Sequence, residues 1–153
     1  MSIRDELTTA LKEALKNKDQ VAMSTIRLMT AAMKDRDIAA RGSGNDEGIA
    51  DGEILSMLQS MIKQRHESSK TYRDADRAEL AEREEEEIKV IERFLPQQMS
   101  EEETGAAIDA IITEVGASCI KDMGKVMAEL KGKYAGQLDM AKAGGAVKAK
   151  LAG

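Results

Sequence analysis

The chain contains one cysteine and one histidine, Cys119 and His66, which are residue types that act as nucleophile and general base in many enzymes. A thiol paired with an imidazole would support acyl transfer, but no motif around either residue predicts that the two lie together. We therefore predict a surface or boundary histidine and a buried or inert thiol, and we assign no catalytic residue. One cysteine and one histidine also fall short of a structural zinc site, so no metal ligand is predicted.

Three other short patterns have the residue types of known reactive sites. Gly124-Lys125 and Gly132-Lys133 resemble the end of a phosphate-binding loop, but the glycine five positions earlier and the following Ser or Thr are absent, so no cofactor is predicted. Ser68-Ser69-Lys70 lies inside a glycine-free helical pattern, which would turn the hydroxyls toward the preceding turn. The acidic run Glu84–Glu87 has no ExxH pair or calcium loop beside it and is interpreted as a solvated helix face.

The lysines near the end of the chain are the feature most suited to binding an anion. Residues 121–153 hold seven lysines and three acidic residues, whereas residues 1–99 hold 16 basic and 20 acidic residues. The candidate RNA-binding residues are Lys121, Lys125, Lys131, Lys133 and Lys142. Lysines that merely keep the protein in solution are the alternative interpretation. Because the chain has one phenylalanine, two tyrosines and no tryptophan, we expect any RNA to be recognised by shape and backbone phosphates rather than by base stacking.

Helices must position all of these residues. Apolar residues recur at spacings of three and four over residues 3–17, 20–38, 51–73, 78–94, 101–115, 122–135 and 139–151. Ser2 with Asp5, Asp19, and Ser100 with Glu103 are predicted helix caps, and the glycines of residues 42–48 predict a flexible loop. No segment alternates with a period of two, and no internal repeat is predicted.

The single proline, Pro96, predicts a division of the chain. We expect an all-α protein with an N-terminal domain of about four helices, residues 1–95, and a small C-terminal three-helix domain, residues 96–153. A single cysteine, the absence of a signal sequence and the absence of a long apolar stretch predict a cytoplasmic protein without a membrane span.

Several sequence blocks resemble the YqeY proteins of the GatB/YqeY family. The most specific blocks are residues 62–68 (IKQRHES), residues 77–81 (RAELA) with Glu84 and Glu87-Ile88, and residues 94–102 (FLPQQMSEE). Residues 26–34 (IRLMTAAMK) and 123–127 (MGKVM) are also similar to that family, so the resemblance covers nearly the whole chain. Phe94 stands where tyrosine is frequent, and residues 136–139 (GQLD) replace the more usual Gly-Arg/Lys-Ala-Asp.

The resemblance implies a C-terminal domain similar to the tail of the B subunit of the glutamyl-tRNA(Gln)/aspartyl-tRNA(Asn) amidotransferase, which recognises tRNA. By association it also implies carbon–nitrogen ligase activity with glutamine as amide donor. This chain has no ATP-binding glycine-rich loop and no amidase nucleophile. The interpretation is therefore an accessory protein without catalysis of its own, with tRNA, amidotransferase subunits or an aminoacyl-tRNA synthetase as partners.

The second hypothesis is a helical protein-docking module that makes no RNA contact. Its candidate partner-binding residues are Arg27, Lys34, Lys63 and Arg65 on the long helices.

Overall fold

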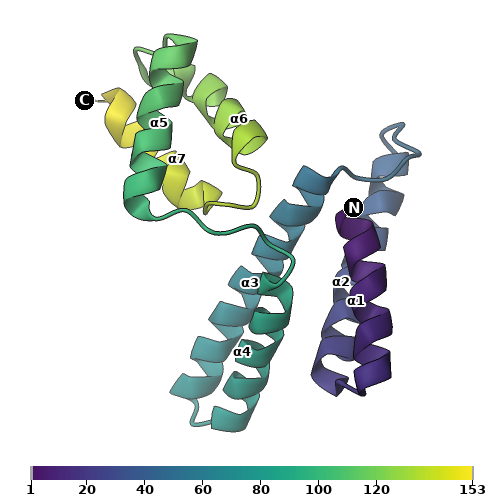
Figure 1. Cartoon of the computed structure of the whole chain (residues 1–153). Helices are drawn as coiled ribbons and strands as arrows, with labels where there is room; N and C mark the ends of the chain where they lie inside the picture. The colour runs from purple at the N-terminus through teal and green to yellow at the C-terminus, as the bar shows by residue number, and fades with distance from the viewer. Residues whose placement is uncertain (1, 153) are drawn as a thin grey trace. The chain divides into compact units, whose positions relative to one another are not determined.

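The computed structural model describes residues 2–152, and every regular element in this part of the chain is helical (Figure 1). The elements are α1 (Ile3–Asn17), α2 (Gln20–Arg41), α3 (Asp51–Asp74), α4 (Ala78–Glu92), α5 (Glu101–Val115), the short 3₁₀ helix η1 (Ile120–Asp122), α6 (Met123–Lys133) and α7 (Met140–Ala152). The predicted all-α class is confirmed.

The chain divides into two compact units, Met1–Leu95 and Pro96–Gly153. In the first unit, α1 and α2 form one hairpin, α3 and α4 form another, and α2 packs against α4. In the second unit, α6 packs against both α5 and α7. Independent folding of the predicted domains 1–95 and 96–153 stays a prediction.

Side-chain caps fix the first two helix starts. Ser2 Oγ accepts a hydrogen bond from the Asp5 N–H at 3.2 Å, and the Asp5 carboxylate accepts the Ser2 N–H at 3.3 Å. Asp19 accepts the Ala22 N–H at 3.1 Å at the start of α2. These bonds satisfy N–H groups that have no partner within the helix, as the sequence predicted.

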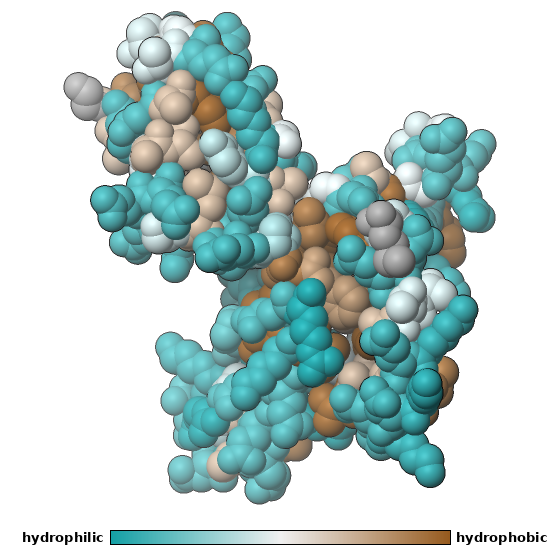
Figure 2. Space-filling model, viewed as in Figure 1, coloured by the Kyte–Doolittle hydropathy of each residue, from teal (hydrophilic) through white to brown (hydrophobic). Residues whose placement is uncertain are grey.

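The core of the first unit is aliphatic and rich in methionine, a flexible side chain that fills irregular spaces. Its buried members are Ile3, Leu7, Ala14, Ala22, Ile26, Met29, Met33, Ile49, Ile54, Met57, Leu58, Met61, Val90 and Ile91. Hydrophobic surface is visible along the line between the two hairpins, with hydrophilic residues on their outer faces (Figure 2). Ile38, at the end of the predicted α2 stripe, is instead 61% exposed.

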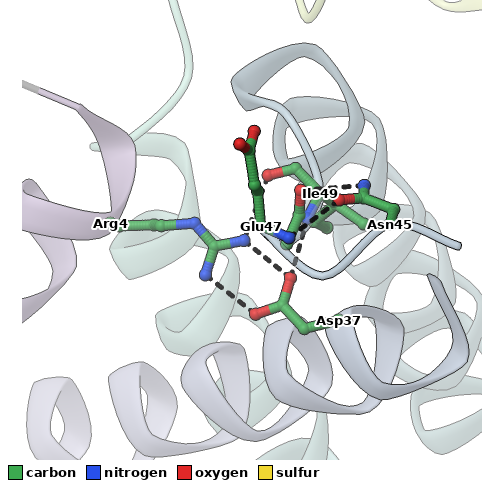
Figure 3. A network of polar contacts seen from close by, with 6 residues as sticks. Arg4, Asp37, Asn45, Glu47 and Ile49 are labelled. Carbon is green, nitrogen blue, oxygen red and sulfur yellow. Dashed lines mark hydrogen bonds and ion pairs between the residues drawn. The ribbon is translucent and has the colours of Figure 1, made fainter. Parts of the chain in front are cut away.

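A polar network holds the loop between α2 and α3 (Figure 3). Arg4 Nη1 and Nη2 donate to the Asp37 carboxylate at 2.8 and 2.6 Å, and Asp37 Oδ1 also accepts the Ile49 N–H at 2.8 Å. These donors lower the pKa of Asp37 to about 2. Gly48 has φ of +94°, and a Cβ there would lie 2.7 Å from Arg4 Nη2. The loop that its glycines predict to be flexible is therefore anchored by α1 and α2 at Ile49.

Ion pairs hold the half of the α3–α4 hairpin nearest its turn. Arg65 Nε donates to Glu87 Oε2 at 2.8 Å, and the two side chains are only 13% and 12% exposed. One turn and two turns further along α3, Ser69 Oγ and Arg73 Nη2 donate to Glu85 Oε1 at 3.0 and 2.8 Å. The seam between the two helices is thus polar here, whereas the opposite half of the hairpin contributes to the apolar core.

This seam corrects the interpretation of the acidic run. Glu84, Glu85 and Glu87 are half-buried, and of the four only Glu86 is exposed. The run is therefore not a solvated face, because two of its carboxylates are bound by arginines of the facing helix. Sequence spacing within α4 could not show which side chains of α3 lie opposite.

The second unit has a separate aliphatic core. Its buried members are Ile108, Ile111, Val126, Leu130, Leu138, Ala143, Val147 and Leu151. Ser100 and Glu103 form the predicted capping box at the start of α5, and Gly116, with φ of +67°, ends this helix in the left-handed conformation that glycine tolerates. The segment after Pro96 is joined to the α6–α7 turn, since Met99 N–H donates to the Gln137 carbonyl at 2.8 Å.

Candidate nucleic-acid interface

Helices α6 and α7 carry the same lysine pattern. At a constant offset of 17 residues, Lys125, Lys131 and Lys133 of α6 correspond to Lys142, Lys148 and Lys150 of α7. The buried residues follow the same offset, since Val126 and Leu130 correspond to Ala143 and Val147. Residues 123–134 and 140–151 therefore share a lysine and core pattern, and each of these two segments is called a repeat below; the prediction that the chain contains no internal sequence repeat stays a prediction.

The last lysine of each repeat is bound to α5. Lys133 Nζ donates to Glu114 Oε2 at 2.5 Å, and Lys150 Nζ donates to Asp109 Oδ1 at 2.6 Å. The hydrogen bond that Lys133 donates to Glu114 raises the pKa of Lys133. Both pairs are partly exposed, so each is expected to add little stability. Their main consequence is that these two ammonium groups already have counter-ions.

The first two lysines of each repeat differ from the third because they form no ion pair with the described residues. Lys125, Lys131, Lys142 and Lys148 are exposed, as is Lys121 in η1, and none of the five forms an ion pair with the residues that the structure describes. All acidic residues of 96–120 lie on α5, and all lysines of the second unit follow Ile120. The second unit thus has no lysine on α5, and the lysines that follow share their part of the chain with Asp122, Glu129 and Asp139.

Two of the three acidic residues after Ile120 serve as caps. Asp122 Oδ2 accepts the Ser118 N–H at 2.9 Å, and this bond contributes most to lowering the pKa of Asp122. Asp139 Oδ1 accepts the Ala141 N–H at 2.9 Å at the start of α7. Both carboxylates therefore accept backbone N–H groups, and Asp122 also interacts electrostatically with the exposed Lys125.

Small residues separate the exposed lysines. The exposed small residues of the two helices are Gly124, Ala128, Gly132, Ala141, Gly145, Ala149 and Ala152. A Cβ at Gly124, Gly132 or Gly145 would meet no atom within 4 Å, so packing inside the unit does not require these glycines. Each costs the helix about 1 kcal/mol relative to alanine. The result is a low surface on which an extended anion can approach the ammonium groups closely.

The predicted RNA-binding lysines separate into two groups. Lys121, Lys125, Lys131 and Lys142 are exposed and form no ion pair within residues 2–152, whereas Lys133 is held by Glu114. Lys148 was not among the predicted residues, although it occupies the same place in its repeat as Lys131. Comparing the chain with itself at an offset of 17 residues would have found it.

The predicted partner-binding residues also differ in their surroundings. Arg27 and Lys34 are exposed on α2, and Lys63 is exposed on α3. Arg65 instead faces the hairpin seam, where it binds Glu87 and donates to the Met61 carbonyl at 3.2 Å. Three of the four side chains are therefore available to a partner, and the fourth is engaged within the hairpin.

The reactive residue types lie in different units. His66 is exposed on α3, and Cys119 is exposed before η1 with its Sγ 3.8 Å from Asp122 Oδ2. The expectation of a buried thiol is thus wrong, and that of an inert thiol stays a prediction. Within residues 2–152, no three His, Cys, Asp or Glu side chains come together as a metal site. None of the described helices is both long and apolar enough to span a bilayer.

Comparison with known proteins connects these features to a family. The family model for Yqey-like protein matches residues 4–151. The chain is 33% identical over 110 residues to altered inheritance of mitochondria protein 41, mitochondrial, of Lachancea thermotolerans, covering 71% of this chain and 57% of that protein. Its namesake in Vanderwaltozyma polyspora is 34% identical over 85 residues, covering 56% and 44%. The chain therefore spans about half the length of these curated relatives.

Proposed function

Because the chain belongs to the Yqey-like protein family, we propose that it is a tRNA-associated accessory protein, related to glutamine-dependent aminoacyl-tRNA amidotransferases. In this proposal η1, α6 and α7 contact the phosphates of a folded tRNA, and the chain has no catalysis of its own. The amidotransferase relation rests on the sequence blocks that resemble the GatB/YqeY family.

One observation carries the RNA proposal: five exposed lysines on η1, α6 and α7 form no ion pair within the described residues. Lysine neutralises backbone phosphates and releases condensed cations, which provides most of the sequence-independent affinity for nucleic acid. The exposed glycines and alanines between the lysines keep the surface low enough for close contact. The repeat offers the same lysine pair on two neighbouring helices, which suits a repeating ligand such as a phosphate backbone.

The composition favours recognition of the backbone over recognition of bases. The chain holds one phenylalanine and two tyrosines, whereas single-stranded nucleic acids are commonly bound by stacking on several aromatic rings. Folded RNA is recognised largely through its shape, phosphates and 2′-hydroxyl groups. A structured tRNA therefore fits this surface better than a flexible single strand does.

The proposal includes amidotransferase subunits or an aminoacyl-tRNA synthetase as protein partners. It places the protein in the cytoplasm, although the curated relatives carry the word mitochondrial in their names.

The repeat supplies a test with a matched control. Lys125→Gln with Lys142→Gln removes an unpaired lysine from each helix, and Lys133→Gln with Lys150→Gln removes an α5-paired lysine from each. Both double variants lose the same charge. Filter binding of total tRNA at several salt concentrations should show that the first pair weakens binding and lowers the slope of log K against log salt by about 2. The second pair should change the slope by less than about 0.5.

The two variants separate local contact from overall charge. If net charge alone attracts RNA, both double variants weaken binding equally. If neither variant alters the affinity, or if the full chain binds no tRNA at low salt, the RNA proposal is wrong. Recovery of a protein partner without RNA would then favour the docking hypothesis, for which Arg27, Lys34 and Lys63 are exposed.

A further inference from the structure

A groove lies along the polar half of the α3–α4 hairpin, beside α2, and the proposed tRNA contact does not use it. Its volume is about 450 Å³, within the range of about 300–1,000 Å³ found for small-ligand pockets. Leu28 of α2 and Leu80 of α4 form part of its wall, and Leu28 is 49% exposed. An exposed leucine at the edge of a polar groove gives a ligand an apolar surface to cover.

Of the two glutamates in the groove, Glu87 forms ion pairs and Glu84 forms none among the described residues. Arg65 Nε lies 2.8 Å from Glu87 Oε2, and Arg83 Nε lies 3.9 Å from Glu87 Oε1. Glu87 therefore engages both arginines. Glu84 lines the same groove, is half-buried, and forms no hydrogen bond or ion pair with any side chain between residues 2 and 152.

The surroundings of Glu84 make a cation the favoured partner. Burial and the nearby Glu87 carboxylate raise the pKa of Glu84, while Arg65 and Arg83 act in the opposite direction, so the two arginines compensate its charge only in part. A partly desolvated carboxylate gains most from a charged hydrogen-bond donor. An acidic ligand would instead compete with Glu87 for Arg65 or Arg83 and would face Glu84 at the same time.

The α3 wall offers further hydrogen bonds. Gln64, Ser68 and Tyr72 follow one another at intervals of four residues and all line the groove. Their side chains form no hydrogen bond with other described residues. One amide and two hydroxyls in a row, next to two leucines, suit a segment that has both peptide groups and an aliphatic side chain.

We infer that this groove binds a lysine or arginine side chain of a partner polypeptide. The ammonium or guanidinium group bonds to the Glu84 carboxylate, the aliphatic stem lies against Leu28 and Leu80, and Gln64 and Ser68 bond to the backbone of the segment. The tRNA proposal does not enter this inference. It also changes the expected partner, because Arg65, proposed from sequence as a partner-binding cation, is already neutralised by Glu87.

Blocked tripeptides test the inference on the full chain. The probes are acetyl-Ala-X-Ala-amide with X as arginine, lysine, norleucine or glutamate, titrated into ¹⁵N-labelled protein and followed by amide chemical shifts. We expect the arginine and lysine peptides to shift the amides of Gln64, Ser68 and Glu84. They should bind about tenfold more tightly than the norleucine peptide, which has a similar stem but no charge.

Variants of α4 and α2 provide the controls. Glu84→Gln should weaken binding of the arginine peptide about tenfold, whereas Glu82→Gln, which removes the same charge from an exposed position outside this groove, should leave it within about twofold. Leu28→Ala, at a half-exposed position where folding is not at risk, should weaken binding about threefold. The inference is overturned by equal binding of norleucine or glutamate peptides, by no binding at millimolar concentrations, or by unchanged affinity in both Glu84→Gln and Leu28→Ala.

Discussion

Replacing Asp37 by asparagine tests how strongly the Arg4–Asp37–Ile49 contacts hold the α2–α3 loop (Figure 3). Asparagine keeps the shape of the side chain but removes its charge and converts one acceptor oxygen into a donor. Asp37 accepts three hydrogen bonds, at 2.6, 2.8 and 2.8 Å. Bonds to charged groups contribute about 1.5–3 kcal/mol each, and bonds that share one acceptor are not additive.

The pKa of Asp37 gives a second measure of this contribution. A pKa lowered from 3.8 to about 2 corresponds to about 2 kcal/mol of folding free energy. Arg4 is 32% exposed and Asp37 is 15% exposed, and screening by water reduces the expected value to about 1–2 kcal/mol. Because folding lowers this pKa, the contribution is complete above about pH 4 and is lost as the pH falls toward about 2.

Urea unfolding followed by far-ultraviolet circular dichroism measures the effect. At pH 7 Asp37→Asn should lower the free energy of unfolding by about 1–2 kcal/mol, and the difference from the parent protein should shrink as the pH falls from about 4 to about 2. Hydrogen exchange should be faster at the Ile49 amide, which donates to Asp37. Asp35→Asn, an exposed site on the same helix, should stay within about 0.5 kcal/mol. Equal stability of the two variants at pH 7, or a difference that does not change with pH, would refute the reasoning.

Two further predictions concern the helices themselves. Thr25 is fully buried and its hydroxyl has no hydrogen-bond partner among the described residues, so Thr25→Val should raise the free energy of unfolding by about 1 kcal/mol in urea titrations; a loss of stability would show that the hydroxyl is satisfied. Ser100→Ala removes the α5 cap, whose Oγ accepts the Glu103 N–H at 3.1 Å, and should lower the thermal midpoint through a loss of about 0.5–2 kcal/mol. No change in that midpoint would show that α5 does not depend on its cap.

Local chemistry is the part of this fold that the sequence predicts best. The caps at Ser2, Asp19 and Ser100 form as expected, because a cap depends on residues three positions apart and on nothing distant. Gly116 ends α5 in the left-handed conformation for the same local reason. Gly144 and Gly145 instead lie inside α7, where Gly144 leaves room beside Met123 and Met127. A Cβ at Gly144 would make only ordinary van der Waals contact with these methionines and one at Gly145 would meet no atom within 4 Å, so packing explains neither glycine.

Pairings between helices could not be predicted from one sequence. Arg65 lies on the inward side of α3, a position that the helical period assigns to apolar residues, and only the opposing Glu87 of α4 explains its burial. Asp37 and Arg4 are 33 residues apart, so the sequence around either residue does not predict their contact. The spacing of the acidic run within α4 therefore predicts a solvated face and gives no sign of its contacts with α3.

Contacts between helices also decide which lysines are available to an anion, and the number of lysines in the sequence does not show this. A count over residues 121–153 gives seven lysines against three acids, which treats every lysine as equally available to an anion. The fold instead binds the third lysine of each repeat to α5 and leaves the first two exposed. The surroundings of equivalent lysines in the two repeats therefore say more about anion binding than the net charge of the segment does. The candidate interface is therefore defined by which ammonium groups form no ion pair within residues 2–152, and the two matched double variants separate that property from charge alone.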